Sequence, residues 1–216
     1  MRKSFFIITI ICIVLILSLQ ISSFAVIDQA KLFIAQEWTS SSSAVSATSY
    51  AVKTFQTLGY DIQGGLPVLK YTVTNNRNDI LNWLSGDGNN YAFFVFAHGA
   101  DGRFNMSRDG ANAPQRIYAS DITGYWHFVF LNCCSSMETD SLARAFKTTG
   151  YSNRASLGWY TTVTDAGSAE WWGYFKNVAG TTNLRSACLA AADNCSYSTP
   201  IRIYGDKTWN GYAWDK

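Results

Sequence analysis

Histidine and proline are scarce in this sequence of 216 residues, which holds 2 histidines and 3 prolines, and only 15% of the residues are charged. With 16 glycines and 48% hydrophobic residues, the composition excludes intrinsic disorder and a collagen-like repeat. Apart from Arg2 and Lys3, 15 basic residues balance 15 acidic ones, so no basic patch predicts binding to nucleic acid or to an anionic membrane surface. Without an internal repeat or a linker, residues 26–216 are expected to form one domain.

Long hydrophobic runs are also absent, except at the N-terminus. Residues 1–25 have a short basic start, an apolar run from Phe5 to Leu19 and a small-x-small end at Ser23 and Ala25. This pattern predicts a secretory signal peptide, because the run is shorter than the roughly 20 residues of a spanning helix, although an uncleaved anchor would have a similar sequence. We therefore expect a secreted or cell-surface protein, with no membrane contact beyond this segment, in a compartment that allows disulfides.

Strand-like and helix-like segments alternate along the rest of the chain. Six runs predict strands, at residues 31–38, 66–74, 91–99, 127–134, 154–163 and 201–206. Helical spacing separates them, as in Val45, Val52 and Phe55, after which Gly59 stands as a C-cap. Runs 91–99 and 127–134 each hold a continuous apolar stretch without polar alternation, which is typical of strands covered on both faces. We predict an α/β domain with a parallel sheet, and small hairpin arms between residues 100 and 126.

A histidine and a pair of cysteines follow the two central runs. His98 and Gly99 end YAFFVFAHG (91–99), and Cys133 and Cys134 end HFVFLNCC (127–134). If these strands are neighbours, their ends lie only about 5 Å apart, at the edge where parallel sheets gather reactive groups. His98 could then accept the proton of a thiol. His127, the other histidine, begins the second strand about 23 Å away, so it cannot take this role.

These features also have structural explanations. A histidine and glycine after an apolar run often form a turn, and adjacent cysteines are often small buried hydrophobic residues. Cys188 and Cys195 lie about 10.5 Å apart on an unbroken helix, so they can form a disulfide only if the helix ends near Asn194, and otherwise belong to the core. Zinc, phosphate-loop and EF-hand motifs are missing, and we expect no metal and no cofactor.

The ordered segments of this chain resemble the landmarks of caspase-like cysteine peptidases of clan CD, especially the CHAT-type, gingipain and clostripain branches. These segments are FFVFAHG, FVFLNCCSSM, ARAF with ASLGWYTTVTDAG, WWGYF with NVAG, and IRIYGD. The resemblance covers nearly all of residues 26–216. It implies a caspase-like three-layer sandwich, with a mostly parallel central sheet of about six strands flanked by helices.

The family pattern also implies roles for single residues. Cys134 takes the place of the nucleophile and Cys133 that of a small residue, with Cys133 as the alternative nucleophile. His98 acts as base and then as acid, and the backbone N–H groups of Gly99 and Cys134 hold the oxyanion. Asp101 could orient the imidazole, although a backbone carbonyl or water would serve as well.

The family pattern places part of the substrate pocket in the loop at residues 159–167. Asp165 could there give a preference for arginine or lysine, with Trp159 as a wall. Alternatively, Asp165 caps the helix that follows.

Together, these patterns predict an exported cysteine endopeptidase that hydrolyses protein or peptide substrates through a dyad of Cys134 and His98. Two other functions stay open: an exported α/β domain that binds or supports without catalysis, and a thiol transpeptidase or amidase acting on cell-wall peptides. The oligomeric state is not predicted.

Overall fold

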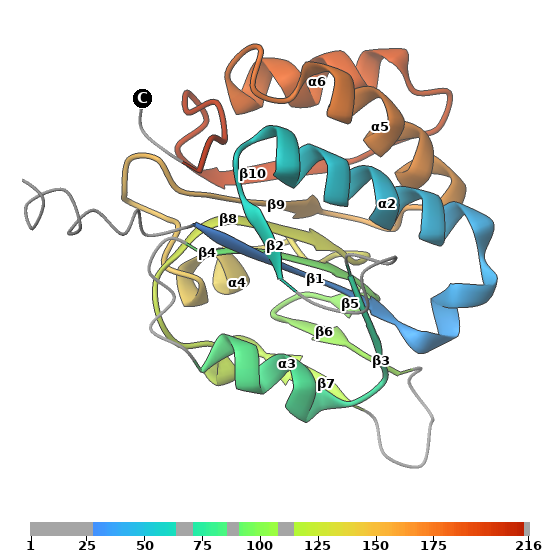
Figure 1. Ribbon diagram of the computed structural model, residues 1–216, viewed down its shortest axis with the longest axis vertical. Helices are drawn as coiled ribbons and strands as arrows, with labels where there is room; N and C mark the ends of the chain where they lie inside the picture. The colour runs from blue at the N-terminus through green and yellow to red at the C-terminus, as the bar shows by residue number, and fades with distance from the viewer. Residues whose placement is uncertain (1–27, 64–70, 86–90, 108–114, 214–216) are drawn as a thin grey trace, which may run out of the picture.

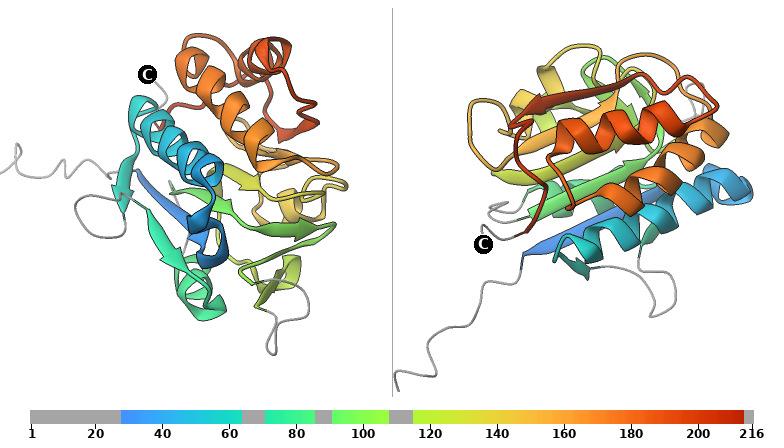
Figure 2. Two further views of the ribbon diagram at one scale, coloured as in Figure 1. Left: turned by 90° about the vertical axis from the view of Figure 1, so that its right-hand side faces the viewer. Right: turned by 90° about the horizontal axis from the view of Figure 1, so that it is seen from above.

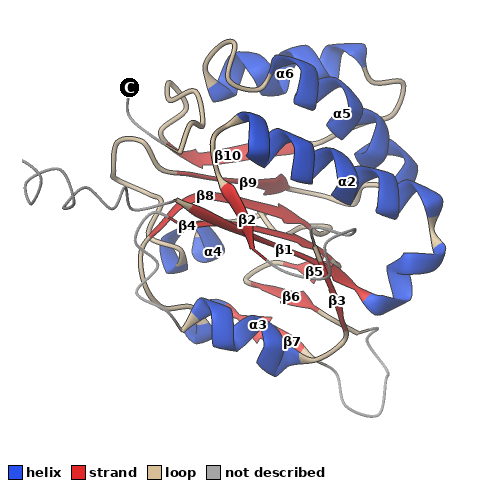
Figure 3. Cartoon of the chain, viewed as in Figure 1, coloured by secondary structure: helices blue, strands red, loops and turns tan. Residues whose placement is uncertain are grey.

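The structure is a computed structural model that describes residues 28–63, 71–85, 91–107 and 115–213. The predicted signal peptide at residues 1–25 lies outside these residues, as does most of the expected strand 66–74. Within the described part of the chain, a central sheet lies between two layers, as Figures 1 and 3 show. No helix in these ranges combines the length and the apolar character that crossing a membrane requires.

Six strands form the central sheet in a row, and a short seventh strand pairs with one of them. In spatial order these are β10 (Ile201–Gly205), β9 (Ala155–Trp159), β8 (Trp126–Asn132), β4 (Tyr91–Phe96), β1 (Gln29–Ala35) and β2 (Asp61–Gln63), with β3 (Thr72–Thr74) beside the second half of β1. All pairs are parallel except β9 with β10. The predicted α/β class, with a mostly parallel sheet of about six strands flanked by helices, is confirmed.

Helices cover both faces of the sheet (Figures 1 and 2). One face carries α2 (Ser42–Thr57), α5 (Asp165–Val178) and α6 (Leu184–Asn194); the other carries α3 (Arg77–Leu84), α4 (Ser141–Ala145) and a small antiparallel sheet of β5 (His98–Ala100), β6 (Arg103–Asn105) and β7 (Arg116–Tyr118). Ser41 caps α2 by accepting a hydrogen bond from the Ala44 N–H at 3.2 Å. Gly59 follows this helix at a φ of +89°, a conformation that favours glycine.

Aromatic side chains fill the core on both sides of the two central strands. Towards α5, the ring of Phe130 lies 5.4 Å from that of Trp171 and 4.6 Å from that of Trp172. On the opposite face, the ring of Phe93 lies 5.6 Å from that of Phe146. Strands β4 and β8 are therefore covered on both faces, as their continuous apolar runs predict.

Several predicted strands are shorter than expected. Strand β1 ends at Ala35, and residues 36–40 form a 3-10 helix, η1 (Gln36–Ser40). Strand β9 ends at Trp159, and the chain then runs as a loop to α5. The pairing of β1 with β4 ends at Ile34 and its pairing with β3 ends at Ala35, so no ladder holds the backbone extended beyond Ala35. Residues of η1 and of the loop after β9 lie at the edge where β4 and β8 end.

Candidate active site

The carboxyl ends of β4 and β8 bring the predicted histidine and cysteine to one edge of the sheet. The two strands are parallel neighbours, with Phe96 opposite Asn132. The Ala97 N–H donates to the Asn132 carbonyl at 3.4 Å, so the chains are still in register one residue further on. His98 and Cys134 each lie two residues beyond this matched pair.

A cavity of about 280 Å³ lies at this edge and is called the thiol cavity below. Its lining residues are Trp38, Phe96, Ala97, His98, Asn132, Cys134, Thr162, Val163, Thr164, Asp165 and Ser168. Cys134 is half-buried, and its Sγ lies 3.5 Å from both the carbonyl oxygen and the amide nitrogen of Val163. Because that N–H donates to the sulfur, the loop after β9 offers the thiolate a hydrogen bond.

Cys133 lies on the other side of the strand end. It is 1% exposed and packs in the core beneath α3 and α4, with its Sγ 3.7 Å from the Val95 carbonyl oxygen. Burial raises the pKa of the Cys133 thiol well above its usual range. A buried thiol that stays protonated is a poor nucleophile, so the geometry favours Cys134 over Cys133.

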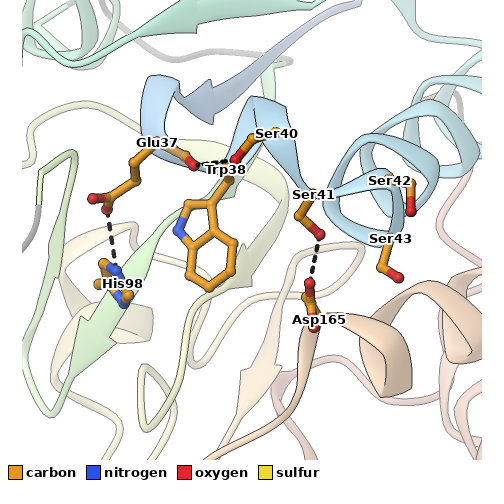
Figure 4. Close-up of a pocket in the computed structure, with 8 residues that line it drawn as sticks. All are labelled: Glu37, Trp38, Ser40, Ser41, Ser42, Ser43, His98 and Asp165. Atoms are coloured by element: carbon orange, nitrogen blue, oxygen red, sulfur yellow. Dashed lines mark hydrogen bonds and ion pairs between the residues drawn. The ribbon is translucent and has the colours of Figure 1, made fainter.

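Glu37, on η1, supplies the carboxylate next to the histidine. Its Oε1 lies 3.1 Å from the Nε2 of His98, and both atoms are buried (Figure 4). The ring of Trp38 packs beside the imidazole, with the ring centroids 5.0 Å apart. Asp101, the carboxylate expected in this role, instead accepts a hydrogen bond from Thr139 Oγ1 at 2.5 Å, on the exposed loop after β5. Glu37 therefore replaces Asp101 as the group that can orient the imidazole.

Gly99 lies directly against the end of β8. A Cβ at this position would come within 2.5 Å of the Cys134 carbonyl oxygen and 2.6 Å of the Cys133 Cβ. Glycine is thus needed for the approach of two backbone segments, in addition to any approach by substrate. Its backbone lies beside Cys134, and the oxyanion role of their N–H groups stays a prediction.

Asp165 lines both cavities of the site but is not the helix cap that the sequence offers as its alternative role, whereas Trp159 does not line a cavity. The N-cap of α5 is Thr164, whose Oγ1 accepts from the Gly167 N–H at 3.0 Å, so Asp165 is not the cap but the first helical residue. Its carboxylate accepts from Ser41 Oγ at 2.5 Å and from the Ala166 N–H at 2.9 Å. Trp159 is fully buried and lines neither cavity of the site, because its indole lies beneath β8.

A second, more polar cavity of about 470 Å³ adjoins the first and is called the serine cavity below. It is lined by Glu37, Trp38, Ser40, Ser41, Ser42, Ser43, His98 and Asp165. In Figure 4, the ring of Trp38 lies between the pair of Glu37 with His98 and the pair of Ser41 with Asp165. Trp38, and not Trp159, is therefore the aromatic wall that the two cavities share.

The remaining cysteines of the described residues lie on α6 and at its end. Helix α6 ends at Asn194, which is the condition for pairing Cys188 with Cys195, yet both thiols are free. Cys188 is buried, which raises the pKa of its thiol, and Cys195 lies 3.5 Å from a carboxylate oxygen of Glu170. Within the described ranges, no three histidine, cysteine or acidic side chains gather as a metal site would require.

Sequence reasoning does not find Glu37 and Trp38, although a signal for them exists. Both follow an apolar run that becomes β1, and β1 is the other neighbour of β4. In a parallel sheet, the residues after this third strand must also reach the edge that carries His98. To use that signal, one must know the order of the strands in the sheet. The local pattern of apolar and polar residues does not give this order.

Comparisons with known proteins add a structural likeness. No protein-family model matches the chain, and no curated protein does. Among solved structures, the chain is similar to caspase-1 from Spodoptera frugiperda, with a TM-score of 0.47, 10% sequence identity, and coverage of 83% of this chain and 87% of that one. At this level of similarity the likeness assigns no role to any residue of this chain.

Proposed function

We propose that this protein is an exported cysteine peptidase in which Cys134 is the nucleophile and His98 the general base and acid. The observation that carries the proposal is that both residues follow the ends of register-matched parallel strands and line one cavity. A half-buried thiol that shares a cavity with an imidazole, which a carboxylate can orient, suits thiol acyl-transfer chemistry.

In the acylation step, His98 takes the proton of the Cys134 thiol, and the thiolate attacks the carbonyl carbon of the peptide bond. The carbonyl oxygen becomes an oxyanion, which the N–H groups of Gly99 and Cys134 would stabilise. As the carbon–nitrogen bond breaks, His98 gives its proton to the leaving amine. The acyl group is then held as a thioester on Cys134.

In the deacylation step, water attacks the thioester carbonyl while His98 removes its proton. The carbon–sulfur bond breaks, the acid product leaves, and Cys134 returns as the thiolate, which His98 reprotonates. Glu37 would hold the imidazole in one orientation and stabilise the imidazolium of both steps. An amine in place of water would give transfer instead of hydrolysis.

The test combines thiol labelling with peptide cleavage. We expect iodoacetamide to label Cys134 in the folded wild type, to label it at least about tenfold more slowly in His98→Ala, and to leave Cys133 unlabelled. Cys134→Ala should abolish cleavage of a mixed peptide library, and Cys133→Ala, the matched control, should keep most of it. Thiol reactivity that does not depend on His98, with no cleavage, would instead indicate a non-catalytic domain.

Product analysis separates hydrolysis from transfer. With an added amine acceptor such as glycinamide, a peptidase gives mainly the free acid, and a transpeptidase gives mainly the new amide. A transfer product in excess would overturn the assignment as a hydrolase while leaving the roles of Cys134 and His98 in place.

Export is the second part of the proposal, and it rests on the N-terminal pattern of residues 1–25. When the full chain is expressed in a secreting host, we expect protein in the medium whose first residue is Val26. Retention in the membrane fraction with an intact N-terminus would identify the segment as an anchor.

A further inference from the structure

Asn132 is a buried amide with one end fixed and the other end without a partner. It is the last residue of β8 and 3% exposed. Its Oδ1 accepts from the Trp159 indole N–H at 2.6 Å and from Ser168 Oγ at 2.9 Å. An indole nitrogen can only donate, so the atom facing Trp159 has to be the oxygen, and the amide cannot be flipped. The Nδ2 has no hydrogen-bond partner among the described residues.

The amide that carries this unpartnered nitrogen lines the thiol cavity. Asn132 stands two residues before Cys134, so both side chains point to the same face of the strand end, and both line the cavity. A buried amide nitrogen without a partner is unfavourable, and a ligand that accepts its hydrogen bonds would remove this cost. The indole nitrogen of Trp38, which also lines the cavity, is buried and has no hydrogen-bond partner among the described residues either.

The rest of the lining limits what this ligand can be. Phe96, Ala97 and Val163 are apolar, and Asp165 contributes a carboxylate. None of the described residues that line the cavity is a lysine or an arginine. An acidic side chain would therefore meet Asp165 without a compensating cation, and a basic one would leave the Asn132 nitrogen unpaired. A carboxamide satisfies both groups, because it accepts through its oxygen and donates through its nitrogen.

We propose that Asn132 selects asparagine or glutamine as the acyl-side residue of the substrate, the residue whose carbonyl carbon Cys134 attacks. The inference rests on the proposed peptidase function and names its substrate class. It also changes the expectation from the sequence, in which Asp165 alone would favour arginine or lysine.

The experiment compares peptides that differ only at the acyl-side residue, in two nearly isosteric series. We expect kcat/KM for glutamine to exceed that for glutamate, methionine and lysine, or for asparagine to exceed that for aspartate and leucine, by at least about tenfold. Equal rates within either series, or a preference for lysine or arginine, would overturn the inference. Cleavage with His98-dependent labelling of Cys134 would leave the peptidase proposal standing in that case, whereas no cleavage of any peptide overturns both.

Variants of Asn132, and of Trp159, which fixes the orientation of its amide, test how the site selects the acyl-side residue. Asn132→Asp keeps an oxygen for Trp159 and replaces the donor, so we expect the ratio of glutamine to lysine cleavage to fall at least about tenfold. Trp159→Phe frees the amide to turn, so it should lower the ratio of glutamine to glutamate cleavage. Asn177→Asp, which adds the same charge on the exposed part of α5, should change neither ratio. Unchanged ratios in Trp159→Phe would contradict the inference even if Asn132→Asp fails to fold.

Discussion

Glu37 is the residue whose position in the site has the clearest consequence. Its carboxylate lies 3.1 Å from the His98 imidazole, and the ring of Trp38 packs beside it, so the imidazole is held from two sides. Holding one orientation matters because the proton must move between His98 and sulfur, and later between His98 and the leaving amine. Trp38 lines both cavities, so the same segment also shapes the space beside the histidine.

Glu37→Gln tests this positioning role. The amide keeps the size of the side chain but cannot stabilise an imidazolium as a carboxylate does, so we expect kcat to fall by about tenfold to a hundredfold with KM within about twofold. Asp101→Asn is the matched comparison, because Asp101 faces Thr139 and should leave kcat within about twofold. Steady-state kinetics on one peptide gives both values, and equal losses in the two variants would contradict the role of Glu37.

At the scale of strands and helices, the predictable part of the fold is the part that burial dictates. The runs that became β4 and β8 are apolar on both faces, and only a central strand explains them. Strand β2 spans three residues and has no such run, and β5 begins where a turn is expected after Ala97. Each is a strand because it pairs with another segment, β2 with residues 29–31 and β5 with residues 103–105. The local sequence pattern does not show these pairings.

The candidate site likewise has a part that the sequence predicts and a part that it does not. His98 and Cys134 could be predicted, because each comes two residues after a strand that the sequence reveals. Glu37 lies 61 residues before His98 and reaches it only through the order β8, β4, β1 in space. From the sequence alone, Asn132 is one more residue of a strand. Its role depends on its hydrogen bond with the Trp159 indole on β9, which the sequence does not show. What the sequence lacks is the pairing between strands.

Gly99 lies in β5 of the small sheet and packs directly against the chain that follows β8, so this position has no room for a side chain. Gly99→Ala would place a Cβ 2.5 Å from the Cys134 carbonyl oxygen, a backbone atom that can move only with the end of β8. We expect the free energy of unfolding to fall by about 1–3 kcal/mol and kcat/KM to fall at least about tenfold, as measured by thermal unfolding and peptide cleavage.

Gly173→Ala on α5 is the control for Gly99→Ala. There a Cβ would lie 3.6 Å from the Tyr50 ring, an ordinary contact, and alanine stabilises a helix relative to glycine by about 0.5–1 kcal/mol. We therefore expect unchanged or slightly higher stability and unchanged activity. Full activity in Gly99→Ala would show that β8 and its two cysteines can move aside without moving the reacting groups.

At the scale of the whole molecule, the two ends of the sheet differ in character. The carboxyl edge of β1, β4 and β8 carries the proposed reacting groups and the two cavities. Asp28 precedes the first strand of the sheet and is 1% exposed. Burial raises its pKa to about 6, and the hydroxyl of the fully buried Tyr60 also has no partner within the described ranges. Among the described residues no cation pairs with the Asp28 carboxylate, so ionised Asp28 lowers the stability of the fold at neutral pH.

Asp28→Asn should therefore stabilise the molecule in a pH-dependent manner. Because the folded pKa of about 6 exceeds the ordinary value of 3.8, the wild type is most stable when Asp28 is protonated in both states, below about pH 4, and loses stability as the pH rises towards 6. We expect the variant to gain about 1–3 kcal/mol relative to the wild type above pH 6 and nothing at pH 3.5, after allowance for partial solvation of the carboxylate. Urea unfolding at both pH values measures this difference. A constant gain at both values would point to packing, and a loss confined to high pH would mean that the Asp28 carboxylate is stabilised when ionised.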